Sequence, residues 1–369
     1  MHSLRSTLTE DGFIELAMHD MPEKELKPTE VLVEVEATPV NPSDLGVMFG
    51  VADTEKAETV EREGKKVLRA PVPPAMVDRF RARVGKPVPI GNEGAGRVVK
   101  AGSSDMAQGL MGKMVAAVSG AMYASHAKVD ATMCFPHNEG TTAVQGASSF
   151  VNPLTALGMT ETMKAEGHKA LVHTAAASNL GQMLNRICLA DGIDLVCIVR
   201  KPEQAKLLRD AGAKHVVDSS EGSFKKDLVD ALAETGATLA FDATGGGTLA
   251  SDILTCMERA ELRKGDEASV YGSTTHKQVY LYGSLDMSPT VLTRNYGMYW
   301  GVGGWLLTPF LAKTDPQKVM QLRQRVADEI DTTFKSEYTA EIGLEDVLDA
   351  KIAKAMQAKA TGEKFLIRP

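Results

Sequence analysis

The sequence has few cysteines, no long apolar run and no excess of basic charge. Its 369 residues include 4 cysteines without C-x-x-C spacing, so structural zinc and disulfide bonds are not expected. No stretch reaches the roughly 18 apolar residues of a membrane span, and the first residues carry no apolar leader, so we expect a cytoplasmic chain with no membrane contact. Acidic residues outnumber basic ones, 48 to 41, which argues against nucleic acid as a partner.

What is present is the composition of a globular protein, with 43% hydrophobic and 24% charged residues on a chain long enough for two domains. Residues 31–40 and 96–100 alternate apolar and polar side chains as half-buried strands do, which favours an antiparallel, barrel-like first domain. The charged, proline-containing stretch 51–88 is predicted to be an insert with a short amphipathic helix over residues 76–84.

From about residue 152 the pattern changes to alternating helices and strands, which is typical of a doubly wound parallel sheet. A helix is expected over residues 317–333, and a last strand at the carboxyl terminus should rejoin the first domain. We therefore predict an α/β protein in which residues 1–150 and 335–369 form one domain and residues 151–334 the other. A cleft between the two would be the place for a ligand.

The most informative segment, residues 171–201, has the pattern of strand, small-residue turn, helix and strand. An apolar run ends at His173, and the small residues that follow allow a sharp turn that opens a helix at Gln182. The N–H groups of such a turn hold a nucleotide pyrophosphate. Because Ala, Ser and Asn replace the first glycines of the G-x-G-x-x-G fingerprint, an ordinary βαβ crossover is the alternative.

The second strand of that segment ends in Arg200 and Lys201. An acidic residue there would accept the ribose hydroxyls of NAD, whereas two cations suit the 2′-phosphate of NADP. The alternative is that these cations simply begin a solvated helix. Two further predicted strands, residues 238–242 and 268–271, precede Gly, Ser or Thr and should end at the same ligand-binding edge.

Four strings together resemble the medium-chain dehydrogenase/reductase superfamily: NPSD at 41–44, GNEG at 91–94, VNPLTA at 151–156, and AASNLGQ with an IVR ending at Arg200. They are more similar to the zinc-free quinone oxidoreductase and 2-enoyl thioester reductase branch than to the alcohol dehydrogenases. The resemblance covers nearly the whole chain apart from the insert at 51–88. It implies a Rossmann-type domain, a GroES-like, partly open β-barrel domain and a homodimer.

The zinc enzymes of this superfamily have Cys and His near the positions of Val40, Asn41 and Asn92. This chain also lacks their cysteine-rich lobe, and its 8 histidines show no paired spacing. We therefore expect NADPH as the cofactor and no metal. Without a Lewis acid the substrate must accept a hydride readily, as quinones and α,β-unsaturated carbonyl compounds do.

The resemblance also implies roles for individual residues. Asn41 and Thr155 would face the nicotinamide, and Arg200 with Lys201 would hold the 2′-phosphate. The pyrophosphate would be surrounded by Ala177, Ser178, Asn179, Leu180 and Gly181. Further cofactor contacts would come from Gly272 and Ser273 of a Y-G-G-like turn and from Trp300, for which a buried or interface position is the alternative.

Enoyl thioester reductases carry a proton-donating Tyr at a position that corresponds here to Ala52, and no Tyr occurs between Asn41 and Tyr123. Tyr123 is the best remaining catalytic donor, with a Tyr packed between strands as its alternative reading. Quinone reduction needs no such residue, because water can protonate the hydroquinone oxygens.

We therefore predict an NADPH-dependent, zinc-independent reductase that transfers a hydride to a quinone or conjugated carbonyl compound. The first alternative is a 2-enoyl thioester or enone reductase, and the second is a non-catalytic NADPH-binding protein. If the chain is a homodimer, the segment 277–284, at the edge of the sheet, is the predicted contact.

Overall fold

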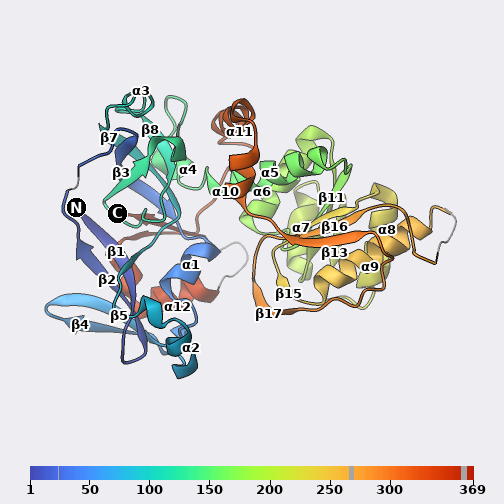
Figure 1. Cartoon of the computed structure of the whole chain (residues 1–369), viewed down its shortest axis with the longest axis horizontal. Helices are drawn as coiled ribbons and strands as arrows, with labels where there is room; N and C mark the ends of the chain where they lie inside the picture. Colours follow the sequence, from blue (N-terminus) through green and yellow to red (C-terminus); the bar gives the residue numbers. More distant parts are fainter. Residues whose placement is uncertain (24, 266–269, 359–363) are drawn as a thin grey trace. The chain divides into compact units, whose positions relative to one another are not determined.

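The computed structural model describes residues 1–23, 25–265, 270–358 and 364–369. Contacts between residues divide the chain into two compact units (Figure 1). Unit 1 comprises Met1–Val151 and Arg323–Pro369, and unit 2 comprises Asn152–Leu322. Each unit has a hydrophobic core of its own. In the described part of the chain, no helix combines the length and the apolar character needed to cross a bilayer.

Unit 1 is built mainly from antiparallel strands in two sheets. The first has the strand order β4-β5-β2-β1-β6. Its members are β1 (His2–Leu8), β2 (Phe13–Asp20), β4 (Glu58–Arg62), β5 (Lys65–Pro71) and β6 (Val88–Pro89). The second has the order β10-β8-β7-β3-β20-β19, with β9 also paired to β3. Its members are β3 (Glu30–Pro39), β7 (Glu93–Ala101), β8 (Met114–Val118), β9 (His126–Asp130), β10 (Cys134–Pro136), β19 (Ala340–Gly343) and β20 (Phe365–Arg368).

Strand β3 holds the second sheet together, as the alternation of residues 31–40 predicted. Its Val31, Val33 and Val35 are buried in one cluster, and β3 pairs with β7, β9 and β20. The pairing with β20 confirms that the last strand rejoins the first domain. Over the described residues this sheet runs from β10 to β19 without closing on itself, in agreement with a partly open β domain.

The insert at 51–88 contains more structure than the sequence predicted. Strands β4 and β5 form a hairpin (light blue in Figure 1), and β5 extends the first sheet by pairing with β2. The expected helix is shorter, α2 (Pro74–Arg79), and is followed by the 3-10 turn η2 (Arg81–Arg83). Because β4 is an edge strand with mostly exposed side chains, its sequence shows no apolar alternation and resembles a charged loop.

The remaining helices of unit 1 are short. They are α1 (Pro42–Met48), α3 (Asp105–Gln108), α4 (Ala143–Gly146) and α12 (Ala350–Ala358), with 3-10 turns η1 (Thr54–Lys56), η3 (Ala131–Met133) and η4 (Glu345–Leu348). Helix α1 carries the NPSD string: Asn41 is the extended N-cap residue, and Pro42 takes the first helical position, where no N–H is needed.

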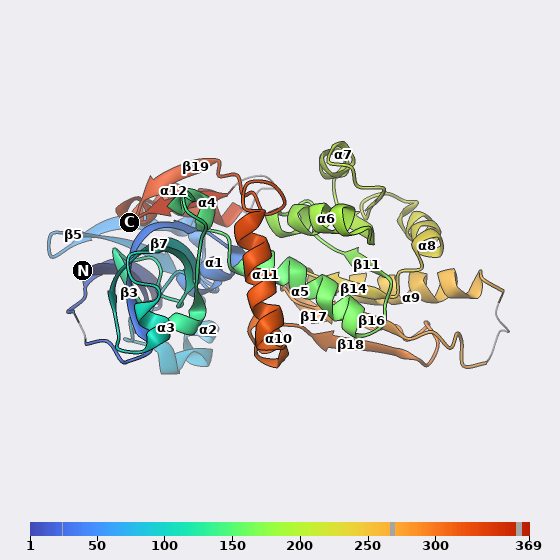
Figure 2. The same ribbon diagram turned by 90° about the horizontal axis from the view of Figure 1, so that it is seen from above.

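Unit 2 is the predicted doubly wound parallel sheet (Figure 2), with the order β13-β12-β11-β14-β16-β18. Its strands are β11 (Ala170–His173), β12 (Asp194–Val199), β13 (His215–Asp218), β14 (Leu239–Asp242), β16 (Lys277–Leu281) and β18 (Trp300–Gly304). A separate pair joins β15 (Gly245–Gly247) to β17 (Asp286–Thr290). The helices are α5 (Val151–Ala165), α6 (Asn179–Asp191), α7 (Pro202–Asp210), α8 (Phe224–Thr235), α9 (Leu249–Leu262) and α10 (Leu307–Lys313), and α11 (Pro316–Asp328) contains the boundary to unit 1.

The strand order of unit 2 reverses beside β11. The chain proceeds from β11 through β12 to β13 on one side and then returns to place β14 on the other side. The loops that follow β11 and β14 therefore diverge at the carboxyl edge of the sheet, which is where open sheets of this kind bind ligands.

Two predictions about the end of this sheet are wrong. Of the strand expected at 268–271, residues 268 and 269 lie outside the described residues, and Val270 and Tyr271 form a turn in which they are 95% and 68% exposed. The segment 277–284 contains β16, which is an internal strand because it pairs with β14 and β18. Its first residue, Lys277, is fully buried on Glu258, and such a buried lysine is not expected in an interior strand.

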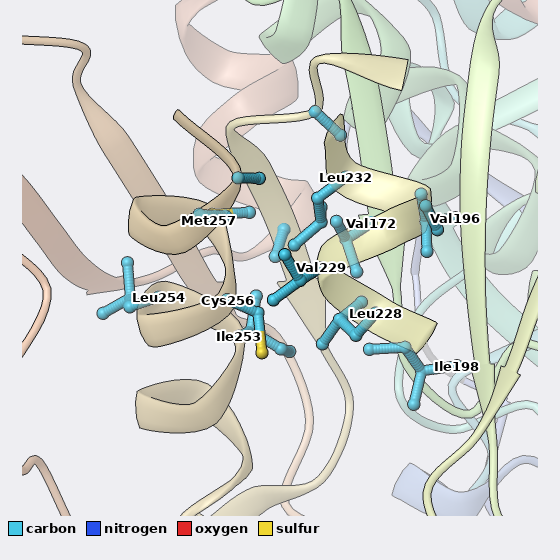
Figure 3. Close-up of a cluster of buried hydrophobic side chains, with 14 of the residues drawn as sticks. Val172, Val196, Ile198, Leu228, Val229, Leu232, Ile253, Leu254, Cys256 and Met257 are labelled. Carbon is cyan, nitrogen blue, oxygen red and sulfur yellow. The ribbon is translucent and has the colours of Figure 1, made fainter. Parts of the chain in front are cut away.

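The core of unit 2 lies between helices α8 and α9 and the sheet. Figure 3 shows side chains of the two helices facing each other, with Leu228 and Val229 from α8 and Ile253 and Cys256 from α9. Val172 of β11 belongs to the same cluster. The apolar faces of these helices thus hold the central strand, and with it the ligand-binding edge, in place.

Leu228→Ala should lower the free energy of unfolding by about 2–5 kcal/mol, because its fully buried side chain would leave a cavity. Leu262→Ala, at the end of α9 where the side chain is 42% exposed, should cost less than about 1 kcal/mol. Urea unfolding followed by circular dichroism measures both values. Equal losses in the two variants would contradict the placement of this core.

Candidate functional site

The predicted small-residue turn lies at the carboxyl edge of the unit 2 sheet, between β11 and α6. The helix begins at Asn179, three residues before the expected Gln182, because Ser178 is its cap and accepts the N–H of Gly181 on Oγ at 3.1 Å. A Cβ on Gly181 would lie 2.2 Å from the carbonyl oxygen of Ala176, so only glycine fits there. The turn is therefore tight although only this glycine of the fingerprint is present.

The two loops at the point where the strand order reverses are bound to each other. The Thr174 hydroxyl donates to Asp242 Oδ1 at 2.7 Å and accepts the N–H of Ala243 at 2.8 Å. Asp242 also accepts the N–H of Thr244 at 2.8 Å. These buried hydrogen bonds fix the shape of the edge before any ligand arrives.

Arg200 and Lys201 follow β12 directly, and both side chains are exposed. The turn after β11 is joined to the end of this strand, since the N–H of Ala176 donates to the carbonyl of Ile198 at 3.2 Å. The N–H of Arg200 donates to Oε1 of the buried Gln204 at 3.1 Å, which holds the backbone of the loop. The cations thus lie after the strand next to the capped turn, at the same edge of the sheet.

A hollow of about 370 Å³ lies at the carboxyl ends of β16 and β18. Its lining residues are mostly aromatic, aliphatic or glycine, and Tyr282 and Ser284 are the lining residues that carry a hydroxyl group, which is the composition of a site for an apolar ring with few polar atoms. The lining residues are Leu281, Tyr282, Gly283, Ser284, Gly304, Trp305, Leu306 and Pro309.

Three predicted cofactor residues lie at the opposite edge, so their placement is wrong. Gly272 and Ser273 precede β16, and the Ser273 hydroxyl donates to Glu258 at 2.6 Å. Trp300 is the first residue of β18, and its ring packs edge-on against Tyr296 with 4.8 Å between centroids. Parallel strands bind ligands at their carboxyl ends.

The residues that do lie at the carboxyl ends were missed, although the sequence carries a signal for them. Tyr-Gly-Ser occurs twice: the copy at 271–273 precedes β16, and the copy at 282–284 follows it directly. Likewise Trp305, not Trp300, follows β18. Its indole N–H donates to Thr162 at 3.1 Å, and its ring packs against Phe241, so the hollow has a fixed wall.

Unit 1 contains a buried polar cluster built from the NPSD and GNEG strings. Asn41 Nδ2 donates to Glu93 Oε1 at 2.8 Å, and the other oxygen of Glu93 accepts two backbone N–H groups at the start of α5, at 3.1 and 2.8 Å. Asp44 accepts the backbone N–H groups of Asn41 and Asn92, both at 2.8 Å. The two carboxyl groups therefore fix both the main chain and the amide of Asn41.

Tyr123 packs between strands, which is the alternative given for it above. Its side chain is fully buried and its hydroxyl donates to the carbonyl of Pro39 at 3.0 Å. Burial, together with the nearby Asp44 and Glu93, raises the pKa of Tyr123 well above its usual value. Since the proton is retained and already shared with the backbone, we do not retain this residue as a proton donor.

Comparison with known proteins agrees with this geometry. Residues 180–294 match the family of zinc-binding dehydrogenases. A solved structure from Mesorhizobium loti, provisionally assigned as an NADPH:quinone reductase, has a TM-score of 0.75 at 24% identity, covering 100% of this chain and 98% of that chain. Quinone oxidoreductase of Escherichia coli, complexed with NADPH, gives 0.72 at 17% identity and covers 100% of both chains. The mitochondrial 2-enoyl thioester reductase Etr1p/Etr2p of Candida tropicalis gives 0.66 at 18%, covering 100% of this chain and 99% of that chain.

The chain has the fold of the medium-chain dehydrogenase/reductase superfamily. The resemblance predicted from the four strings is thereby confirmed, and both quinone reductases and an enoyl reductase are among the similar structures. Thr155 belongs to α5 and Asn41 is the N-cap residue of α1, and both side chains are buried.

The residues of this medium-chain reductase fold do not fit a catalytic zinc ion. Val40, Asn41 and Asn92 supply neither thiolate nor imidazole, and Asn41 is bound to Glu93. Within the described ranges no three His, Cys, Asp or Glu side chains gather as a ligand set. The cysteines are buried free thiols, and burial raises the pKa of Cys134 to about 12, so it keeps its proton.

The cluster of unit 1 adds buried ionisable groups that sequence reasoning missed. Burial raises the pKa of Asp44 to about 7 and also raises that of Glu93. Lys364, just before β20, is buried with its pKa lowered to about 8, and its amine has no hydrogen-bond partner among the described residues. Asp44 and Glu93 belong to recognised strings, whereas nothing in the sequence distinguished Lys364.

The buried Asp44 predicts a pH-dependent stability. Its pKa rises from 3.8 to about 7 on folding, so between these values the native state binds a proton that the unfolded chain has lost. The stabilisation is present below pH 4 and is lost as the pH rises through 7. Relative to Asp44→Asn, the wild type should be more stable at pH 5 than at pH 8, by about 1–4 kcal/mol.

Urea unfolding at both pH values measures this difference. Asp105→Asn, an exposed carboxyl in the first turn of α3, is the matched control and should show the same difference from wild type at both. A pH-independent effect of Asp44→Asn would show that this carboxyl is ionised in the native state throughout.

Proposed function

We propose that this protein is an NADPH-dependent, zinc-independent reductase that transfers a hydride to a quinone or conjugated carbonyl compound. One observation carries the proposal: two exposed cations follow the strand next to a capped small-residue turn, at the point where the order of a doubly wound sheet reverses. Similar structures named as a quinone oxidoreductase with NADPH and as an enoyl thioester reductase support the same class of reaction.

The proposed cofactor site uses the residues at this edge. Ala177, Ser178, Asn179, Leu180 and Gly181 form the turn and first helical turn that would surround the pyrophosphate. Arg200 and Lys201 would hold the 2′-phosphate. In place of Gly272, Ser273 and Trp300 we propose the residues of the hollow, namely Tyr282, Gly283, Ser284 and Trp305. This hollow, together with Thr155, would bind the nicotinamide. NADPH, when bound, supplies the hydride.

Asn41 remains the proposed catalytic residue. Its Nδ2 carries two hydrogens, one of which is bound by Glu93, and the described residues offer no partner to the second. That hydrogen is available to an acceptor oxygen that gains negative charge. Asp44 and Glu93 would serve it as positioning residues, because they hold its backbone and its amide.

The chemistry of the acceptor follows from the groups present. Among the described residues no three His, Cys, Asp or Glu side chains form a metal-ligand set, which supports an acceptor that takes a hydride without a Lewis acid. The hydroxyl of Tyr123 is buried and bonded to the Pro39 carbonyl, so it is not a proton donor for the substrate. Reduction of a quinone, whose product oxygens water can protonate, therefore fits this protein better than reduction of an enone or enoyl thioester, whose product must be protonated at carbon by a positioned donor. The similarity to an enoyl thioester reductase supports that activity as the second candidate. A non-catalytic NADPH-binding protein is the third.

We also propose that the protein is a cytoplasmic homodimer. The strand β16 of the predicted contact at 277–284 is internal, so the edge strand next to it is β18, which among the described strands pairs only with β16. An unpaired edge strand rich in glycine is a ready site for pairing with a second copy.

Arg200→Ala should raise the Kd for NADPH by about 10- to 100-fold and that for NADH by less than about twofold, because a charge-assisted contact to phosphate is lost. Fluorescence titration of the two nucleotides measures both constants. Lys206→Ala, which removes an exposed cation from α7, is the control and should leave both unchanged. Equal weakening of NADPH and NADH by Arg200→Ala would place the 2′-phosphate elsewhere.

Oxidation of NADPH should be faster with 9,10-phenanthrenequinone than with crotonyl-CoA, and EDTA should leave both rates unchanged. Absorbance at the nicotinamide band follows both reactions. Turnover of the thioester alone would favour the second candidate. Tight binding of NADPH without oxidation across quinones and enals would favour a binding protein.

A further inference from the structure

His173, the last residue of β11, is fully buried and bonded to a tyrosine at the ligand-binding edge. Its Nε2 lies 2.7 Å from the hydroxyl oxygen of Tyr282, and the two rings are stacked with 5.6 Å between centroids. Tyr282 follows β16, and its backbone N–H donates to the carbonyl oxygen of Asp242 at 3.0 Å. The pair therefore joins the ends of β11 and β16 and has a fixed geometry.

The surroundings of the imidazole decide which group donates in this pair. Burial lowers the pKa of His173 to about 3, so the ring is neutral and carries one hydrogen. Its Nδ1 is buried without a partner among the described residues. A hydrogen on Nδ1 would leave a buried donor unpaired, which is rarer in proteins than an unpaired acceptor. We therefore assign the hydrogen to Nε2, which donates to the tyrosine oxygen.

This tautomer leaves the O–H of Tyr282 free to donate to something else. Burial and the nearby Asp242 raise the pKa of Tyr282, so the hydroxyl keeps its proton. Tyr282 lines the hollow at the carboxyl ends of β16 and β18, whose other walls include Leu281, Trp305 and Pro309. The described residues that line this hollow include no Lys or Arg, so an apolar group with a neutral acceptor suits it better than an anion.

We propose that the Tyr282 hydroxyl, held by His173, donates a hydrogen bond to a carbonyl oxygen of a flat, apolar ligand bound in this hollow. The carbonyl belongs either to the hydride acceptor or to the carboxamide of the nicotinamide, and the inference rests on the proposed function. Tyr282 is then a binding residue that touches the ligand, and His173 is the positioning residue that directs its hydrogen.

Tyr282→Phe removes this donor and keeps the ring. Losing one neutral hydrogen bond should weaken the affected ligand by about 2- to 13-fold. If the carbonyl is that of the acceptor, kcat/KM for phenanthrenequinone falls by this factor and the Kd for NADPH is unchanged. If it is the carboxamide, the Kd values for NADPH and NADP⁺ rise by this factor. Values within twofold of wild type in both measurements would overturn the proposal.

Two tyrosines provide matched controls. Tyr271→Phe changes the exposed tyrosine of the other Tyr-Gly-Ser copy, and Tyr280→Phe changes one on β16 that donates to Glu166 at 2.7 Å. Both should keep kcat/KM and Kd within twofold of wild type. A loss in these variants equal to that of Tyr282→Phe would also overturn the proposal, because the effect would not be specific to the hollow.

Nitrogen NMR of the whole histidine-labelled chain tests the tautomer without any activity. The His173 signal, identified by its loss in His173→Gln, should show hydrogen on Nε2. A hydrogen on Nδ1 would overturn the proposal while leaving the proposed function intact, even if Tyr282→Phe fails to fold. A wild type that binds no NADPH would instead contradict the proposed function itself.

Discussion

Parallel pairing is the constraint on which the unit 2 site depends. Because β11, β12, β14, β16 and β18 all run in one direction, their carboxyl ends meet at one edge, and a residue before a strand cannot share that edge with a residue after one. Ser178, Arg200 and Tyr282 each follow a strand and Asp242 ends one, so all four meet this condition. These residues come from four separate segments of the sequence between positions 178 and 282, and the common direction of the strands brings them to one edge.

The same constraint explains which parts of the site could be predicted. The turn after His173 and the cations after β12 belong to one continuous strand-turn-helix-strand pattern, so their place followed from local sequence. Beyond β14 the pattern is ambiguous: Val270 and Tyr271 are apolar yet exposed, and β16 begins with a buried lysine. The energetic compensation for that lysine is Glu258, at 2.6 Å, which comes from a helix and is invisible in the strand's own sequence. For this reason we chose from the sequence the Tyr-Gly-Ser copy at 271–273 and Trp300, which precede or begin a strand. The copy at 282–284 and Trp305, which follow a strand, were not chosen.

In unit 1 the NPSD and GNEG strings could be recognised in the sequence, but the buried hydrogen bonds that their side chains form could not be predicted from it. The β domain and the return of β20 to β3 follow from alternation and could be predicted, whereas the β4–β5 hairpin could not, because edge strands lack a buried face. Asp44 and Glu93 resemble surface carboxyls in the sequence. Only the fold shows that they are buried and that they hold Asn41 through hydrogen bonds. Burial of these two carboxyl groups costs free energy, and the hydrogen bonds that they accept from backbone N–H groups compensate for this cost.

The hydrogen bond between Gln204 and the backbone of Arg200 limits which residues the loop after β12 can carry. A lysine in place of Gln204 would bring a further cation close to the backbone of Arg200. The Gln204 side chain is buried and occupied with the loop, so a lysine would add a charge while removing the brace that shapes the loop. A cation at position 204 and the present shape of this loop therefore exclude each other. A change from glutamine to lysine at position 204 would therefore require further substitutions that restore the shape of the loop at Arg200.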